Sequence, residues 1–240
     1  MKQLWIFGYG SLMWKPGFAF DRAQQAILRG HSRAFCIYSV HHRGTAARPG
    51  LVLGLDRGGV CSGVAYRIPS EHARATLAYL REREQVTGVY RETVCPVQLI
   101  GGSLGGGGAS RAPESNDPRD VRALVYLVER AHPQYAGHLP LAGQARLIRR
   151  AVGISGRNLD YLVSTVTHLR AMGIAEPALE RVTTLAGGHL LARLRANGGS
   201  TIVNDRGVGS GLLPFGPKLN ADLMHRFIYR RNLMLQAESG

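Results

Sequence analysis

The order of the secondary-structure signals along the chain is the feature that most restricts the fold. Up to residue 128 the sequence contains short β-branched and aromatic segments bounded by Gly, Pro or Arg, as strands are. After residue 140 the apolar residues instead recur with helical spacing. Strands followed by helices are typical of an α+β fold, whereas a parallel α/β sheet needs the two to alternate. The predicted strands are LWIFGYG (4–10), AFCIYSV (34–40), LVLGL (51–55), SGVAYRI (62–68), VYRETVCPVQLI (89–100) and RALVYLV (122–128).

One helix is predicted within this β-rich part, over EHARATLAYLRERE (71–84), with Pro69-Ser70 as its N-terminal capping signal. Its apolar face ends in an acid, because the residues that share the face are Ala73, Leu77, Leu80 and Glu84.

Glu84 is therefore a candidate acid–base group. Burial disfavours a charged carboxylate and would raise its pKa toward the range that is useful for proton transfer. The alternative is an ordinary glutamate at a helix end, exposed or paired with a nearby arginine, and the pattern leaves both open. Arg81, Glu82 and Arg83 are predicted to point elsewhere as solvated charges.

Three more helices are predicted after residue 140, over 141–153, 158–173 and 176–198. Gly173 stands where a helix C-cap favours glycine, and Pro177 is expected near the first position of the last helix.

Two stretches rich in Gly, Ser, Pro and Asp divide the chain. We interpret residues 101–120 as a flexible inserted loop and residues 197–240 as a C-terminal extension. Residues 1–196 are then expected to form a single domain.

The stretch FGYGSLMWKPG after the first strand fits none of the familiar glycine-rich motifs. Gly8 and Gly10 match a dinucleotide fingerprint, but Met13 replaces its third glycine. A Walker A ending is absent, and a nucleophile elbow would need glycine in place of Tyr9 and Met13 around Ser11. The remaining interpretations are a turn without chemistry or a turn whose main-chain N–H groups approach a ligand closely.

Composition limits the possible partners. Thirty Lys and Arg against sixteen Asp and Glu give a formal net charge of +14, which favours an anionic partner of some kind. The charges are scattered, however, without a zinc-finger pattern, an aromatic ribonucleoprotein motif or a clustered basic helix, so we predict no nucleic-acid partner. No histidine or cysteine spacing suits a metal, and none is predicted.

The location is expected to be the cytoplasm. No apolar stretch approaches the roughly 20 residues of a spanning helix, and the first apolar run is too short for a signal peptide, so no membrane association is predicted. Cys36, Cys61 and Cys95 lie far apart and suit a reducing compartment.

Several separated motifs, taken in order, resemble the ChaC-type gamma-glutamylcyclotransferases over about residues 4 to 190. Motifs that recur in the same order are far more specific than any one of them. They are WIFGYGSLMWKPGF, HHRGTAARPG (41–50), SGVAYRI (62–68), REREQVTGVY (81–90) and ISGRNLDYL (154–162).

The resemblance implies a mixed β-barrel with helices packed around it, and cleavage of the gamma-glutamyl bond of glutathione to 5-oxoproline and Cys-Gly without a cofactor. It places the catalytic acid–base group at Glu84 and, more loosely, a substrate contact at Tyr161. The chain departs from the family at Ala46-Ala47, where the family often has Pro-Glu. The implied substrate loop consists of Ile6, Phe7, Gly8, Tyr9, Gly10 and Ser11.

This chemistry agrees with the residues. The substrate's own α-amine attacks its γ-carbonyl, so the enzyme needs no Ser or Cys nucleophile. It needs a base, N–H donors for the developing oxyanion, and groups that hold the α-carboxylate, for which Arg43 and Tyr90 are candidates. The alternatives are a cyclotransferase for other gamma-glutamyl amines or peptides and, from the charge, a nucleic-acid-binding protein.

Overall fold

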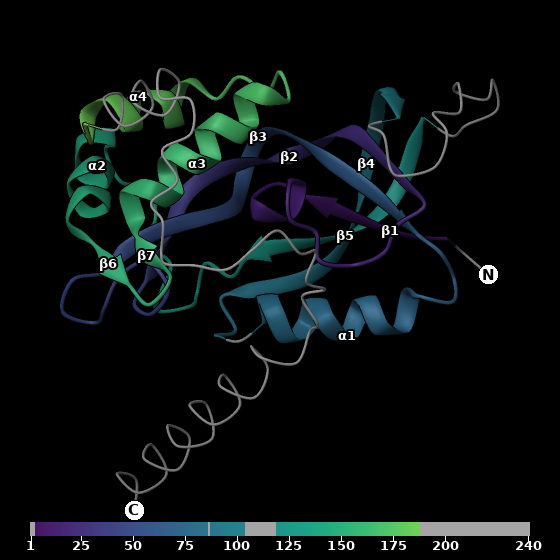
Figure 1. Cartoon of the computed structure of the whole chain (residues 1–240), viewed down its shortest axis with the longest axis horizontal. Helices are drawn as coiled ribbons and strands as arrows, with labels where there is room; N and C mark the ends of the chain where they lie inside the picture. Colours follow the sequence, from purple (N-terminus) through teal and green to yellow (C-terminus); the bar gives the residue numbers. More distant parts are fainter. Residues whose placement is uncertain (1–2, 86, 104–118, 188–240) are drawn as a thin grey trace, which may run out of the picture. The chain divides into compact units, whose positions relative to one another are not determined.

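The structure, a computed structural model, describes residues 3–85, 87–103 and 119–187. Within these residues a closed barrel forms with the strand order β1-β3-β2-β4-β5 (Figure 1). Neighbouring strands are antiparallel except β1 and β5, which run parallel, so the barrel is mixed as predicted. The strands are β1 (Leu4–Gly8), β2 (Arg22–Ser39), β3 (Gly50–Ile68), β4 (Tyr90–Ser103) and β5 (Asp120–Val128).

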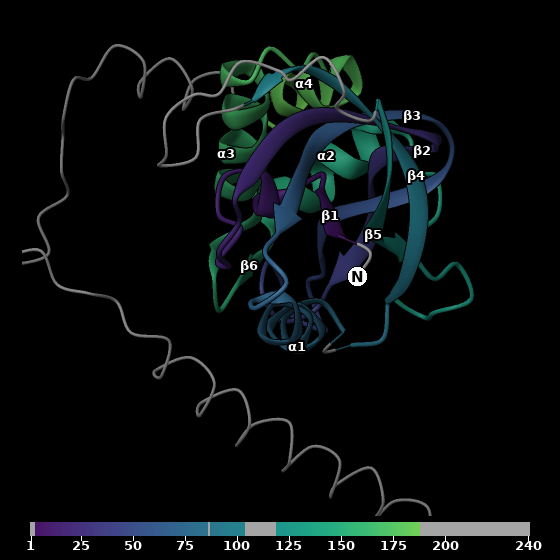
Figure 2. The ribbon, with the colours of Figure 1, turned by 90° about the vertical axis from the view of Figure 1, so that its right-hand side faces the viewer.

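The helices lie on two sides of the barrel. Helix α1 packs along one side, and α2, α3 and α4 gather on the opposite side (Figures 1 and 2). None of the described helices has the length and apolar character that a membrane crossing needs. The elements are α1 (Ala73–Glu84), α2 (Leu141–Arg150), α3 (Asn158–Ala171), α4 (Pro177–Leu185), the hairpin strands β6 (Val152–Gly153) and β7 (Gly156–Arg157), and the short 3-10 turn η1 (Ser11–Met13).

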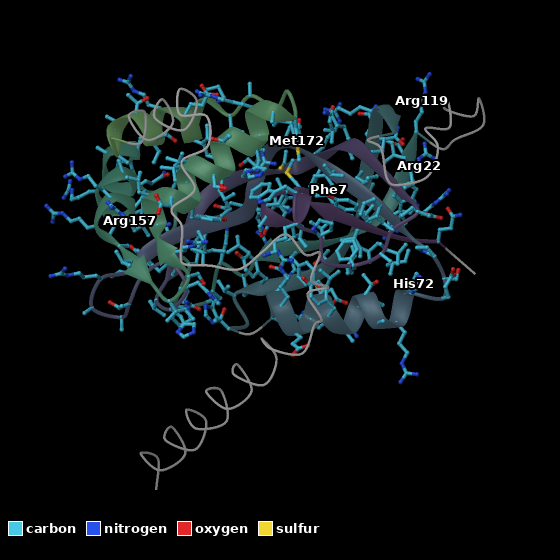
Figure 3. The ribbon with its side chains drawn as sticks, viewed as in Figure 1. Phe7, Arg22, His72, Arg119, Arg157 and Met172 are labelled. Atoms are coloured by element: carbon cyan, nitrogen blue, oxygen red, sulfur yellow. The ribbon has the colours of Figure 1, made fainter. Side chains whose placement is uncertain are left out.

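The core fills the barrel and continues under the second group of helices. Phe7 lies in the middle of the barrel, whereas Arg157 lies at the end formed by the β6–β7 hairpin (Figure 3). Burial of these apolar side chains is the main force that holds the strands and helices together. The largest side chains that are wholly buried include Ile6, Phe7, Leu28, Phe35, Leu80, Tyr126, Ile148 and Leu162.

The central hairpin is longer than the sequence predicted. Strand β2 starts at Arg22 and β3 continues through residues 56–61, where no strand was expected. The first half of β2 was not predicted, because its many polar residues do not form the apolar pattern of a strand. Gly30, Gly58 and Gly59 have positive φ angles, which in a sequence suggest turns. In the structure they lie within the paired strands β2 and β3, where the register of pairing shifts between residues 29 and 31.

The start of α1 was predicted wrongly. His72 occupies the N-cap without a side-chain cap hydrogen bond, and its N–H donates to the Pro69 carbonyl, so Ser70 lies in a turn before the helix. Helix α2 ends at Arg150, three residues before the predicted end, because Val152 already belongs to β6.

The ends of the later helices agree with the prediction. Gly173 has a φ of 70°, and the N–H groups of Gly173 and Ile174 donate to the carbonyls of Arg170 and Leu169, the pattern of a glycine-terminated helix. Helix α4 begins at Pro177 as expected.

Parts of the predicted organisation lie outside the described residues. Most of the inserted loop 101–120 is among them, although β4 extends to Ser103 and β5 begins at Asp120. The later part of the helix predicted over 176–198, the domain end at residue 196 and the extension 197–240 also lie outside.

Candidate active site

The loop after β1 is fixed by side chains that donate to its main-chain carbonyls. Tyr66 on β3 donates its hydroxyl to the carbonyls of Leu12 and Met13, at 3.0 and 2.8 Å. Arg33 on β2 donates its Nε to the carbonyl of Tyr9 at 2.5 Å. The loop therefore takes its path from two barrel strands and not from its own sequence alone.

Arg83 connects this loop with α1. Its Nη2 donates to the Ser11 hydroxyl at 2.9 Å, and its Nη1 donates to the Lys15 carbonyl at 3.1 Å and to the Tyr79 hydroxyl at 2.9 Å. Its Nε lies 3.1 Å from Oε1 of Glu84. The prediction that Arg83 is a solvated charge pointing elsewhere was wrong, because its long side chain reaches back across the end of the helix to the loop.

Glu84 ends α1 on the inward face, as predicted. Its side chain is 18% exposed, and Leu80 one turn earlier is fully buried. Burial raises the pKa of the Glu84 carboxyl, and the neighbouring Arg83 opposes this rise. Glu84 is thus both largely buried and paired with an arginine, which combines the two alternatives that the sequence left open.

The charge of Glu84 affects the three tyrosines of the predicted site, which come from different parts of the chain. Burial raises the pKa of Tyr9 and of Tyr90 well above its ordinary value, with Glu84 among the charges that add to the effect. Burial likewise raises the pKa of Tyr161, on α3, to about 12. The Tyr90 hydroxyl donates to the Leu53 carbonyl at 2.7 Å. At neutral pH these phenols are protonated and can act as hydrogen-bond donors.

Arg43 belongs to the same region through Tyr161. Its guanidinium carbon lies 5.2 Å from the centroid of the Tyr161 ring, within cation–π range. Its Nη1 also donates to the carbonyl of Ser155 at 2.5 Å. The half-buried Arg43 is thus held between the β6–β7 hairpin and α3.

Asn158 fixes the loop that carries Arg43. Its wholly buried amide accepts the N–H of Leu51 at 2.7 Å and donates to the carbonyl of Leu51 at 2.8 Å, as a neighbouring strand would. At Gly50 a Cβ atom would lie 2.2 Å from the Arg43 carbonyl, so only glycine allows this close approach. The motifs HHRGTAARPG and ISGRNLDYL are therefore adjacent in space.

The structure divides the predicted substrate loop into two parts. Ile6 and Phe7 are wholly buried on β1, and their side chains belong to the barrel core. Gly8 is also buried, whereas Gly10 and Ser11 are partly exposed. Ser11 starts η1, where the first N–H groups have no partner within the turn. Any contact between this loop and a ligand would therefore involve main-chain atoms of the loop or the side chains of residues 9–11.

Metal ligands do not gather in the described part of the chain, where no group of three or more His, Cys, Asp and Glu residues could hold an ion. The three cysteines are buried and unpaired.

Sequence reasoning missed Arg33, Tyr66 and Asn158 and misjudged Arg83. The sequence held one usable signal, since Arg33 and Asn158 are polar residues next to apolar runs, AFCIY and LDYLV. Polar residues at such positions need a partner when they are buried. The partners themselves lie 24 and 107 residues away, which no local pattern shows.

The chain matches the model of the family described as ChaC-like protein over residues 4–186. It is 38% identical to the Escherichia coli (strain K12) protein named glutathione-specific gamma-glutamylcyclotransferase, over 73% of this chain and 69% of that protein. It is 35% identical to mouse glutathione-specific gamma-glutamylcyclotransferase 1, over 71% of each. A crystal structure of a yeast gamma-glutamyl cyclotransferase specific to glutathione shares the fold, with a TM-score of 0.67 and 24% identity over 79% of this chain and 97% of that chain.

Proposed function

The chain belongs to the ChaC family, and from this premise we propose that it is a gamma-glutamylcyclotransferase that cleaves glutathione to 5-oxoproline and Cys-Gly. The observation that carries the proposal is the placement of Glu84. A largely buried carboxyl group with a raised pKa is paired with Arg83, which connects it to the glycine-rich loop through the Ser11 hydroxyl. No nucleophilic Ser or Cys is required by this reaction, which suits a site built around a single acid–base group.

The proposed step is an intramolecular transfer. The α-amine nitrogen of the substrate attacks its γ-carbonyl carbon, the ring C–N bond forms, and the amide bond to cysteine breaks. Glu84 takes a proton from the attacking amine and returns it to the departing amide nitrogen, so no water is consumed. The raised pKa supports this role, since a carboxylate of ordinary pKa is a weak base at neutral pH.

Donors for the developing oxyanion are proposed to come from the loop and the phenols. The N–H groups at the start of η1, which have no partner within the turn, are proposed to fill this role. Tyr9 and Tyr90 are protonated, but the Tyr90 hydroxyl already donates to the Leu53 carbonyl and can serve the oxyanion only by releasing it. Tyr161 is proposed to contact the substrate as well, because the charge of Glu84 contributes to the raised pKa of its phenol.

Arg43 is proposed to hold the α-carboxylate of the substrate. Its guanidinium group lies over the Tyr161 ring, and a guanidinium can bind a carboxylate in a bidentate manner. Tyr90 remains a second candidate for this contact.

We infer a cytoplasmic location from the same proposal. The buried, unpaired state of all three cysteines suits a reducing compartment, which is also where glutathione would be reduced.

Release of 5-oxoproline tests the proposal. The protein is incubated separately with glutathione, oxidised glutathione and gamma-glutamyl-alanine, and we expect the highest kcat/KM with glutathione. Turnover of gamma-glutamyl-alanine alone would favour a cyclotransferase for other gamma-glutamyl compounds. No product from any substrate would refute the proposal, and salt-sensitive binding of nucleic acid in that case would favour the other alternative.

The role of Glu84 is tested by Glu84→Gln with Glu82→Gln as its control. Glu82 is exposed on the same helix, so its substitution changes the same charge without touching the site. We expect kcat to fall at least about 100-fold for Glu84→Gln and to stay within about twofold for Glu82→Gln. Near-full activity of the folded Glu84→Gln variant would remove Glu84 from the mechanism.

A further inference from the structure

A buried arginine of β2 connects the loop after β1 with the segment before α4. The side chain of Arg33 is 0% exposed, although it carries a full charge. Its Nε donates to the carbonyl of Tyr9 at 2.5 Å, and its Nη2 donates to the carbonyl of Ser62 at 2.6 Å. Its Nη1 donates to the carboxylate of Glu176, the residue directly before α4.

The geometry of these bonds uses the shape of the guanidinium group. The N–H donors of Arg33 point in different directions within the guanidinium plane and reach the loop after β1, β3 and the segment before α4 together, a geometry that a lysine ammonium does not reproduce. A buried charge is costly unless it is paired and hydrogen-bonded, and Glu176 supplies the counter-charge. The arrangement therefore has two separable parts, charge neutralisation by Glu176 and a fixed donor for Tyr9.

We propose that Arg33 is a positioning residue for substrate binding, which acts by holding the Tyr9 carbonyl, with Glu176 as its counter-ion. Tyr9 stands between the buried strand β1 and the partly exposed Gly10 and Ser11, so the orientation of its peptide group decides where the following N–H groups point. Arg33 contacts the loop but not Glu84, whose position depends on α1. Loss of Arg33 should thus misplace the loop donors and lower kcat/KM, while the acidic limb of the pH profile, which reports Glu84, stays in place; this consequence rests on the proposed cyclotransferase function.

The double variant Arg33→Met/Glu176→Met separates positioning from stability. Replacement of a buried ion pair by apolar residues of similar volume is often neutral for stability. The single variant Glu176→Met leaves the arginine charge buried without its partner and should melt at a lower temperature than the double variant. We expect the double variant to melt above Glu176→Met but below the wild type, because the carbonyls of Tyr9 and Ser62 lose their donor. Its kcat/KM for glutathione should be about tenfold lower, the value of one charge-assisted hydrogen bond.

The matched control is Arg170→Met/Glu180→Met, which removes an exposed ion pair between α3 and α4 with a distance of 3.1 Å. It should change neither kcat/KM nor the melting temperature appreciably. Arg33→Lys, which keeps the charge but not the fork, should lower kcat/KM in the same direction as the double variant.

Hydrogen exchange gives a readout that does not depend on activity. Exchange of the main-chain N–H groups of Met13 and Lys15, which are bonded within the loop, should be faster in the double variant, with residues 123–127 of β5, which pair with β4, as an unchanged reference. Loop exchange and kcat/KM equal to wild type, or failure of both Arg33 variants to fold, would overturn the inference and assign Arg33 to the fold alone. Absence of wild-type turnover would instead refute the proposed function, and exchange would still decide whether Arg33 positions the loop.

Discussion

Replacing Asn158 with alanine is expected to lower the free energy of unfolding by about 2–6 kcal/mol. The wholly buried amide makes two hydrogen bonds with the main chain of Leu51, at 2.7 and 2.8 Å. Alanine leaves one buried N–H and one buried carbonyl without partners, and each such group costs about 1–3 kcal/mol. Since a native protein is stable by only about 5–15 kcal/mol, this one amide carries a large fraction of the total.

Urea denaturation followed by circular dichroism measures this change. The expected result is a lower midpoint with an unchanged slope, because the surface exposed on unfolding stays the same. Thr45→Ala is the control: its hydroxyl also accepts a main-chain N–H, from Arg48 at 3.1 Å, but at an exposed position, where the loss should stay below about 0.5 kcal/mol. A loss under about 1 kcal/mol for Asn158→Ala would show that water or the backbone satisfies Leu51 instead, and would refute the reasoning.

Three further changes test the site. Arg83→Met removes the cation that lowers the pKa of Glu84, so the acidic limb of the kcat/KM profile should move to higher pH, and an unmoved limb would contradict the pairing. Because burial raises the pKa of Glu84 in the folded state, its stabilising contribution is present at low pH and lost as pH rises through that pKa. Glu84→Gln should therefore melt higher than wild type at pH 8 but not at pH 3. Gly17→Ala would place a Cβ 2.2 Å from the Tyr79 hydroxyl, whereas Gly30→Ala, also at positive φ, meets nothing within 4 Å, so activity should fall only for Gly17→Ala.

Local sequence patterns predicted the structure correctly where it depends only on residues within the same helix or strand. The apolar spacing of α3 predicted its buried face, and Gly173 predicted its end, since both depend on residues within one or two turns. Glu84 was found in the same way, as an acid that continues an apolar face. The first half of β2 was not found, because its polar residues are stabilised by pairing with β3 and carry no strand signal of their own.

The supporting residues of the site could not be predicted for a related reason. Arg83 resembles its exposed neighbours Arg81 and Glu82 in sequence, and three of its acceptors come from the loop some 70 residues earlier. The sequence thus singled out Glu84, the proposed acid–base group, but not the arginines that contact its surroundings. A long side chain takes its direction from the acceptors within its reach, which are set by the tertiary fold.

The hydrogen bonds that these side chains make determine which polar groups of the loop after β1 remain for a ligand. The carbonyls of Tyr9, Leu12 and Met13 accept hydrogen bonds from Arg33 and Tyr66 on the barrel side. Arg83 occupies further carbonyls and the Ser11 hydroxyl from α1. The N–H groups at the start of η1 have no partner within the turn and remain for a ligand. A loop that offers donors and withholds acceptors favours an anionic ligand or a developing oxyanion, which is what a gamma-glutamyl substrate brings to a cyclotransferase.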